Sequence, residues 1–292
     1  AANRMRIPLA KMACEETGYG IMVDKVTKNQ YASEHVWNYM RNKKTCGVIE
    51  ENKAFGTMRI ASPKGVIAAI TPTTNPTSTT IYKMLLALKT RNAIILSPHP
   101  HAVNCSIAAA KIIRDAAIEA GLPEHVISWV SVPSLEISDY LMKNVDLIMA
   151  TGGSGMVKAA YSSGTPAIGV GPGNCNVVID ESADLRMAVE SIIHSKTFDN
   201  GMICASEQHI TVLASVYDEV KRLLKEARCY FLKDDEAAKV AEVFFNSKTH
   251  GVKPGAVGQT ANRLAEMAGI DVPYDTKVLI YETDDTSHDC AW

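Results

Sequence analysis

The chain has 292 residues, enough for two domains with a sizeable core, and its composition of 47% hydrophobic and 21% charged residues is that of an ordinary globular protein. With a net charge of −2, the chain has no overall positive potential that would attract nucleic acid. It also has no polybasic segment that would bind a membrane surface. No apolar run reaches the length of a membrane span, and the first residues lack the apolar core of a signal peptide.

Helices are predicted at 3–17 and 28–42, and two extended runs follow at 46–50 and 56–61. From residue 65 onward, apolar strands alternate with helices. The strands are expected at 65–72, 93–98, 126–131, 146–151 and 167–180, and the helices at 76–91, 101–120, 155–163 and 183–197. This alternation predicts βαβ crossovers and an α/β fold with a parallel sheet covered on both faces.

The strand and helix pattern starts again after Cys204. Strands are expected at 209–215 and 277–282, and helices at 216–228 and 234–247. We therefore expect a domain boundary near 190–200, which divides the chain into residues 1–195 and 196–292.

The cysteines are odd in number and scattered, at positions 14, 46, 105, 175, 204, 229 and 290. In a protein of this size, that pattern predicts reduced thiols and a cytoplasmic location rather than a disulfide framework. No pair has CxxC spacing and no HExxH segment occurs, so the sequence predicts no metal site.

The segment KTFDNGMICASEQ, residues 196–208, is the strongest candidate for chemistry. It places Cys204 just beyond a glycine and among small or polar residues. A cysteine nucleophile needs such room for a substrate carbonyl, and a nearby backbone N–H for the oxyanion. Single cysteines are also common in protein cores, so the segment by itself leaves both roles open.

Four predicted strand ends carry unusual residues, and ligands of doubly wound sheets bind beyond such ends. The first is TPTTNPT, residues 71–77. In one interpretation, Asn75 or Thr74 caps the next helix, with Pro76 in its first turn. In the other, Asn75 offers its amide N–H to a substrate carbonyl. In the second case the threonines would lie near cofactor phosphates.

The other three ends are SPHPH (97–101), TGGSG (151–155) and GVGPGN (169–174). His99 stands between two prolines, which predicts an exposed and rigidly held loop residue. TGGSG joins a strand to a helix and can present helix N–H groups to a phosphate, although it lacks the GxGxxG spacing. The glycines of GVGPGN predict a close backbone approach, either to a ligand or to a packed helix.

Several titratable residues near the cysteine receive structural interpretations. His194 and His209 flank the segment, but their spacing does not require contact with Cys204. Asp199 and Glu207 are expected to be solvated or capping acids.

Four segments together resemble one family closely: TPTTNPTST, LKTRNAIILSPHP, ATGGSGMVKAAYSSGTPAIGVGPGN and SKTFDNGMICASEQ. They are similar to the CoA-acylating aldehyde dehydrogenases, above all to the N-terminal half of the bifunctional aldehyde-alcohol dehydrogenases, over about residues 1–280. The resemblance implies an aldehyde dehydrogenase-like fold. Residues 1–195 would form a parallel Rossmann-like NAD-binding domain, and residues 196–292 an incomplete α/β catalytic domain.

By position, Cys204 matches the family's nucleophile and Asn75 its oxyanion-stabilising asparagine. The residues that match the NAD-contacting loops are Ile70, Thr71, Pro72, Thr73, Thr74, Ser97, Pro98, His99, Gly153, Ser154, Gly171 and Pro172. The resemblance implies NAD as cofactor, coenzyme A as co-substrate, and a small aldehyde and acyl-CoA as substrates. It also implies a homo-oligomer in the full-length protein, and no metal, because the iron-binding alcohol dehydrogenase half is absent from this sequence.

The implied reaction is the reversible conversion of acetyl-CoA and NADH to acetaldehyde, NAD and CoA through a thioester on Cys204. The chain starts and stops early relative to the family. This motivates the alternative of a catalytically inactive fragment that acts as a cofactor-binding or assembly module. A hydrolytic aldehyde dehydrogenase is a third hypothesis, but it needs a glutamate that activates water, and the sequence offers no convincing one near Cys204.

Overall fold

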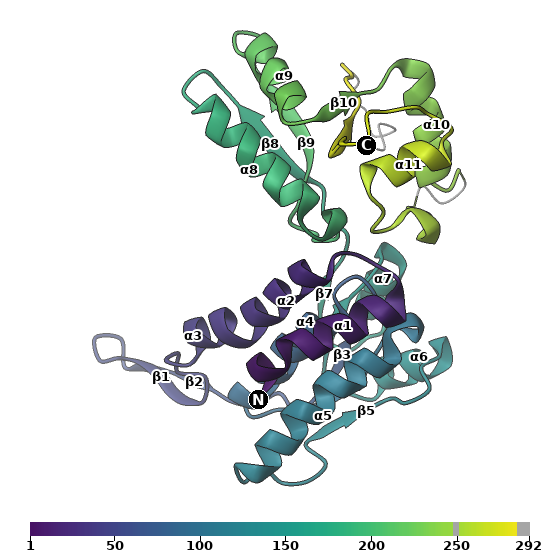
Figure 1. Cartoon of the computed structure of the whole chain (residues 1–292). Helices are drawn as coiled ribbons and strands as arrows, with labels where there is room; N and C mark the ends of the chain where they lie inside the picture. Colours follow the sequence, from purple (N-terminus) through teal and green to yellow (C-terminus); the bar gives the residue numbers. More distant parts are fainter. Residues whose placement is uncertain (248–250, 285–292) are drawn as a thin grey trace. The chain divides into compact units, whose positions relative to one another are not determined.

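The computed structural model describes residues 1–247 and 251–284, and the chain forms two compact units (Figure 1). The N-terminal unit comprises Ala1–Gly18 and Met22–Pro172, and the C-terminal unit comprises Tyr19–Ile21 and the residues from Gly173 onward. Each unit has an apolar core of its own. The segment TSHDCAW, with Cys290, lies outside the described residues.

The N-terminal unit is built on a sheet with the strand order β5-β4-β3-β6-β7. Its strands are β3 (Val66–Ile70), β4 (Ala93–Ser97), β5 (Ile127–Trp129), β6 (Leu147–Thr151) and β7 (Ala167–Val170). The helices between them are α4 (Pro76–Lys89), α5 (Val103–Glu119), α6 (Leu135–Lys143) and α7 (Ser154–Ser162). Every neighbouring pair in this sheet is parallel, so the predicted α/β fold is confirmed.

Helices cover both faces of this sheet, as the side chains of β6 show. Met149 belongs to a core cluster with residues of α4 and α5, whereas Ile148 and Ala150 pack with Met142 of α6 and Ala160 of α7. Successive residues of a strand point to opposite faces, so α4 and α5 cover one face and α6 and α7 the other. The change of face accompanies the reversal of strand order between β3 and β6.

Helical segments precede the sheet: a 3-10 turn (Ala2–Met5), α1 (Arg6–Thr17), α2 (Met22–Gln30), a π-helical turn (Tyr31–His35) and α3 (Val36–Met40). The helix predicted over 28–42 therefore begins earlier, at Met22. The reason is that α2 buries Lys25 and Lys28 and leaves Val23 exposed. Its first half consequently lacks the apolar periodicity that indicates a helix.

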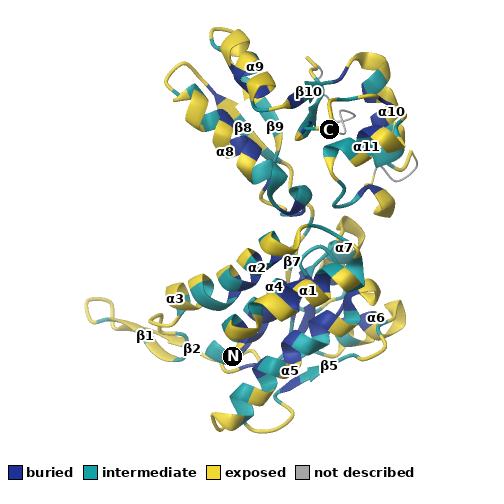
Figure 2. Cartoon of the chain, in the orientation of Figure 1, coloured by how far each residue is buried: buried dark blue, intermediate teal, exposed yellow. Residues whose placement is uncertain are grey.

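An antiparallel hairpin of β1 (Gly47–Asn52) and β2 (Thr57–Ala61) follows these helices. Most of its residues are exposed (Figure 2), among them the apolar Val48, Met58 and Ile60. A two-stranded hairpin is marginally stable by itself in water, and clustered exposed apolar side chains are typical of a surface that a partner covers.

Within the described residues, the C-terminal unit contains two pairs of parallel strands. β8 (Cys175–Ile179) pairs with β9 (Glu207–Val212), and β10 (Cys229–Phe231) pairs with β11 (Val278–Ile280). The helices of this unit are α8 (Leu185–Thr197), α9 (Tyr217–Glu226), α10 (Asp234–Phe244) and α11 (Ala261–Met267), with 3-10 turns at Phe198–Gly201 and Pro254–Ala256. Its main apolar cluster joins Ile179 of β8, Val189 of α8 and Val220 of α9.

The units divide between Pro172 and Gly173, upstream of the boundary expected between residues 195 and 196. β8 and α8 precede that expected boundary, yet β8 pairs with β9 and α8 packs against α9. Hydrophobic periodicity indicates where a strand lies but not which sheet it joins, so the sequence could not place β8 in the second unit.

Candidate active site

The four predicted loops leave the N-terminal sheet from one edge. In the parallel ladders, Ser97 is paired with Ile70, Ile70 with Ala150, and Ala150 with Gly169. These residues lie at or near the carboxyl ends of β4, β3, β6 and β7. The strand order reverses between β3 and β6, and such a reversal is where doubly wound sheets bind their ligands.

A buried lysine joins the two strands at this reversal. Lys83 of α4 is 1% exposed, and its ammonium donates to the backbone carbonyls of Ile70 (2.6 Å) and Met149 (2.8 Å). Burial lowers the pKa of Lys83 to about 7 because the charged amine loses its hydration. The two hydrogen bonds hold the ends of β3 and β6 together where the first loop begins.

That loop starts with a buried hydroxyl. Thr71 is 1% exposed, and its backbone N–H donates to the carbonyl of Ser97 (3.1 Å). Within the described residues its Oγ1 has no hydrogen-bond partner. Buried hydroxyls are rarely left unpaired, and ordered water or a bound ligand supplies the missing partner. Contact between a cofactor and the 70–74 stretch is compatible with this orphaned hydroxyl and stays a prediction.

Asn75 occupies the N-cap position of α4, and Pro76 is the first residue of that helix. The capping interpretation is nevertheless wrong for the Asn75 side chain, which makes no capping hydrogen bond. Its Oδ1 accepts from Nζ of Lys28 (2.7 Å), and its Nδ2 donates to Oγ1 of Thr74 (3.0 Å). Because an ammonium only donates, Lys28 determines which end of the amide is the oxygen.

The second loop has a fixed shape. Ser97 and Pro98 are buried, and His99 is exposed, as the sequence predicted. His99 occupies the N-cap position of a 3-10 turn (Pro100–Ala102), and its Nδ1 accepts from the N–H of His101 (3.2 Å). The other candidate cofactor residues are half-buried or exposed on their loops: Pro72, Thr73, Thr74, Gly153, Ser154, Gly171 and Pro172.

The glycines of the third and fourth loops serve different purposes. Gly153 is the N-cap residue of α7, and a Cβ there would meet no atom within 4 Å. A Cβ on Gly169 would lie 2.8 Å from side chains of α7, so this glycine lets α7 pack against β7. A Cβ on Gly173 would lie 2.4 Å from the carbonyl oxygen of Cys204. Helix packing thus explains Gly169, and close approach to the cysteine segment explains Gly173.

Cys204 is exposed and follows a turn of unusual backbone geometry. Asp199, Asn200 and Gly201 all adopt left-handed conformations, with φ angles of 49°, 53° and 71°. Side chains other than glycine enter this region only when surrounding contacts enforce it. One such contact is the hydrogen bond from Nδ2 of Asn200 to the carbonyl of Gly258 (2.8 Å).

Asp199 is fully buried, so the prediction of a solvated or capping acid is wrong. Its Oδ1 accepts from the backbone N–H of Ile21 (2.7 Å), 178 residues away in the chain. A Cβ on Gly20 would lie 2.0 Å from this oxygen, so the glycine is needed for the approach. The sequence contains no signal for a contact over such a separation.

Cys175, for which the sequence predicts no role, also contacts the backbone of Cys204. It donates from Sγ to the Cys204 carbonyl (3.3 Å). Gly173 lies just before β8 and Cys175 is the first residue of that strand, whose partner β9 starts at Glu207. The pairing of β8 with β9 therefore determines where the cysteine segment lies within the C-terminal unit.

Other titratable groups surround this segment in sequence. His194 is exposed on α8 and His209 is half-buried in β9, and their structural roles stay a prediction. Lys196 donates to Oε1 of Gln208. Burial lowers the pKa of Lys196, and the charge of Glu207 opposes that shift. Glu207 is half-buried, with one buried oxygen that has no partner in the described part of the chain, so it is not simply a solvated acid.

Comparison with known protein families assigns the chain to one of them. The sequence profile of the aldehyde dehydrogenase family matches residues 2–240. The chain belongs to the aldehyde dehydrogenase family. The matched range includes the whole sheet of the N-terminal unit and the Cys204 turn, so both units contribute to the family's fold.

Individual members of the family resemble the chain over nearly its whole length. The aldehyde-alcohol dehydrogenase of Clostridium acetobutylicum is 55% identical over 282 residues, which are 97% of this chain and 32% of that protein. The crystal structure of an acetylating aldehyde dehydrogenase from Geobacillus thermoglucosidasius aligns with a TM-score of 0.92 and 46% identity, over 98% of this chain and 63% of that one.

A propionaldehyde dehydrogenase from Rhodopseudomonas palustris, solved with bound CoA and an acylated cysteine, aligns with a TM-score of 0.81 and 33% identity. The alignment covers 95% of this chain and 63% of that one. The resemblance to CoA-acylating aldehyde dehydrogenases and the aldehyde dehydrogenase fold are confirmed. The chain spans about a third of the length of its curated aldehyde-alcohol dehydrogenase relative.

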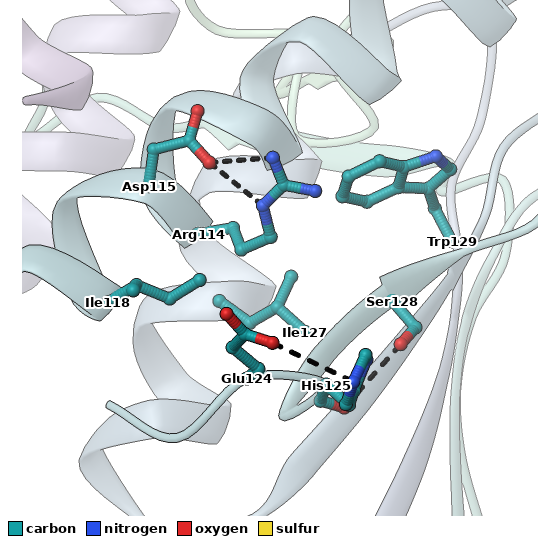
Figure 3. A pocket seen from close by; sticks show the side chains of 8 residues that line it. All are labelled: Arg114, Asp115, Ile118, Glu124, His125, Ile127, Ser128 and Trp129. Atoms are coloured by element: carbon teal, nitrogen blue, oxygen red, sulfur yellow. Dashed lines mark hydrogen bonds and ion pairs between the residues drawn. The ribbon is translucent and has the colours of Figure 1, made fainter. Parts of the chain in front are cut away.

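A cavity of about 440 Å³ lies in the N-terminal unit (Figure 3). It is lined by side chains of α5, β5 and the segment between them. Arg114 donates to Oδ1 of Asp115 (2.7 Å) and stacks on Trp129, with its guanidinium carbon 4.8 Å from the ring centre. The guanidinium is thus engaged by its own neighbours, and none of the predicted site residues lines this cavity.

Two kinds of feature are absent from residues 1–247 and 251–284. No helix there is long and apolar enough to cross a membrane. No group of three or more His, Cys, Asp or Glu side chains there is arranged to hold a metal ion.

Proposed function

We propose that this chain carries the aldehyde dehydrogenase activity of a CoA-acylating enzyme, which interconverts acetaldehyde and acetyl-CoA with NAD(H). The observation that carries the proposal is the Cys204 turn. It presents an exposed thiol on a backbone fixed by the left-handed residues 199–201 and by the close approach of Gly173. The acylated cysteine of the Rhodopseudomonas palustris relative supports a covalent role for this thiol.

In the proposed reaction, the Cys204 thiolate attacks the aldehyde carbon and forms a hemithioacetal with a negatively charged oxygen. The backbone N–H of Cys204 and Nδ2 of Asn75 donate hydrogen bonds to this oxyanion. The aldehyde hydrogen then leaves as hydride, and Cys204 is left as a thioester. The nicotinamide cofactor, when bound, supplies the hydride acceptor.

Coenzyme A completes the cycle, because the acyl group passes from one thiol to another. The CoA thiolate attacks the Cys204 thioester, and the tetrahedral intermediate uses the same two hydrogen-bond donors. Collapse of the intermediate releases Cys204 as thiolate and yields acyl-CoA. Since reactant and product are both thioesters, the exchange is nearly isoenergetic and the reaction runs in both directions.

The loops at the carboxyl edge of the N-terminal sheet are the proposed cofactor site. The buried hydroxyl of Thr71 has no partner in the described part of the chain, and the open N-terminus of α7 behind Gly153 offers backbone N–H groups to a pyrophosphate. These groups fit a dinucleotide. The choice of NAD rather than NADP follows from the family resemblance.

A homo-oligomer in the cytoplasm is also part of the proposal. The exposed apolar side chains of Val48, Met58 and Ile60 on the β1–β2 hairpin support association with a further copy. Within the described residues, the cysteines form no disulfide, which supports a reducing compartment.

The test is to follow NADH formation from acetaldehyde by the protein expressed from its complete reading frame, with and without coenzyme A. We expect turnover that requires coenzyme A and prefers NAD to NADP. Aldehyde oxidation that persists without coenzyme A would favour the hydrolytic alternative. Saturable NAD binding without turnover would favour the cofactor-binding module.

A further inference from the structure

Helix α2 has an unusual distribution of polar side chains. It buries Lys25 (2% exposed), Lys28 (9%) and Asn29 (0%), whereas the apolar Val23 on the same helix is 66% exposed. Lysines are almost never fully buried, because the ammonium loses its hydration and needs compensating hydrogen bonds. The buried polar side chains of α2 therefore need hydrogen-bond partners in the segment against which this helix packs.

The polar face of α2 holds the loop that follows β3. Lys25 donates from Nζ to the backbone carbonyl of Thr74 (3.1 Å), and Lys28 donates from Nζ to Oδ1 of Asn75 (2.7 Å). The Oδ1 of Asn29 accepts from Oγ1 of Thr77 (2.8 Å). The loop is thus bound through the backbone of Thr74, and the first turn of α4 is bound through the hydroxyl of Thr77. Only Lys28 binds the Asn75 amide itself among these three contacts.

The chemistry of the two groups makes the Lys28 contact directional. A carboxamide has an acceptor end and a donor end of nearly equal size, and it can rotate to exchange them. An ammonium has three donors and no acceptor, so it binds the oxygen end and disfavours the opposite orientation, in which N–H groups would face each other. A charged donor on Oδ1 also polarises the amide and strengthens its N–H groups as donors.

We propose that Lys28 is a positioning residue for catalysis: it holds the Asn75 amide with Nδ2 as the donor to the oxyanion. This inference rests on the proposed function, in which Asn75 stabilises that oxyanion. Lys25, which donates to the neighbouring backbone carbonyl of Thr74, is the matched control for general support of the loop.

The test is a double-mutant cycle measured as kcat for NADH formation in the protein expressed from its complete reading frame. Asn75→Ala should lower kcat on the order of a hundredfold to a thousandfold, as loss of one oxyanion donor does. Lys28→Met should lower kcat by roughly tenfold or more, with the KM for NAD unchanged. In the Asn75→Ala background, Lys28→Met should change kcat less than about twofold, because the amide that it orients is gone.

The Lys25→Met control separates orientation of the amide from support of the loop. Its effect on kcat should be the same with and without the Asn75 amide. Two further variants guard against misfolding. Asn75→Asp keeps an acceptor for Lys28 but removes the donor, so it should lose kcat like Asn75→Ala. Lys28→Gln keeps a donor but adds an acceptor, so its kcat should lie between wild type and Lys28→Met.

The outcomes distinguish the oxyanion role proposed for Asn75 from the positioning role proposed for Lys28. If both Asn75 variants keep the wild-type kcat, the proposed role of Asn75 is wrong. If they lose kcat but Lys28→Met and Lys28→Gln do not, the positioning role of Lys28 is wrong. It is also overturned if Lys28→Met costs the same factor in both backgrounds, as a merely structural residue would.

Discussion

The buried Lys83 should make the folded chain more stable as the pH rises above neutrality. Burial lowers the pKa of this lysine from an ordinary value of 10.5 to about 7. Below pH 7 it is protonated in both the folded and the unfolded chain, and the burial penalty is fully present. Between pH 7 and 10.5 the folded chain loses this proton while the unfolded chain keeps it, so the free energy of unfolding increases with pH.

The expected gain in the free energy of unfolding follows from the difference in bound protons between the folded and the unfolded chain. A difference of one bound proton changes the free energy of unfolding by about 1.4 kcal/mol per pH unit. From pH 7 to pH 9, wild type should therefore gain roughly 2 kcal/mol relative to Lys83→Met, which has no group to titrate there. The loss of the hydrogen bonds to Ile70 and Met149 shifts the variant's stability at every pH, so it cancels from this slope.

The assay is urea unfolding of this chain at pH 7, 8 and 9, followed by circular dichroism. Wild type is compared with Lys83→Met and with Lys158→Met, in which an exposed lysine of α7 is replaced. The stability difference should widen with pH for Lys83→Met and stay constant for Lys158→Met. A constant difference for Lys83→Met would refute the reasoning, because it would mean that the two carbonyl hydrogen bonds keep Lys83 charged to pH 9.

The remaining predictions concern the cysteine segment. Cys204→Ala should abolish aldehyde oxidation, measured as NADH formation, and leave NAD binding by calorimetry unchanged. Gly173→Ala should lower kcat because its Cβ would lie 2.4 Å from the Cys204 carbonyl oxygen, whereas Gly255→Ala, with open space around it, should not. Asp199→Ala should lower the free energy of unfolding by about 1–3 kcal/mol, and Asp199→Asn by less, since it keeps an acceptor for Ile21. Iodoacetamide should alkylate Cys204 before Cys229 in peptide mapping, because burial raises the pKa of Cys229 to about 12.

The fold of the N-terminal unit is predictable because its strands are apolar on both faces. The run VIAAI (66–70) and its counterparts at 93–97 and 147–151 can only be buried between layers, and Gly65, Pro72 and Pro76 mark the turns beside the first of them. Once the strands are known to be parallel, their carboxyl ends share one edge. The grouping of the candidate loops then follows from topology alone.

The polar interior is not predictable in this way. Lys28, Lys83 and Asp199 have side chains that are solvated in most proteins, and their burial depends on partners far away in the sequence. Lys28 needs the amide of Asn75, and Asp199 needs the backbone N–H of Ile21. Hydrophobic periodicity depends on the spacing of apolar residues, so it does not reveal a helix such as α2 that buries its lysines.

The most direct test of the central claim is detection of the acyl-enzyme. The protein expressed from its complete reading frame is incubated with acetyl-CoA in the absence of NADH, and its peptides are mapped by mass spectrometry. We predict an acetyl group on the peptide that contains Cys204, its removal by added coenzyme A, and its absence from Cys204→Ala. An acetyl group on a different cysteine, or aldehyde oxidation by a protein whose Cys204 never becomes acylated, would contradict the proposed mechanism.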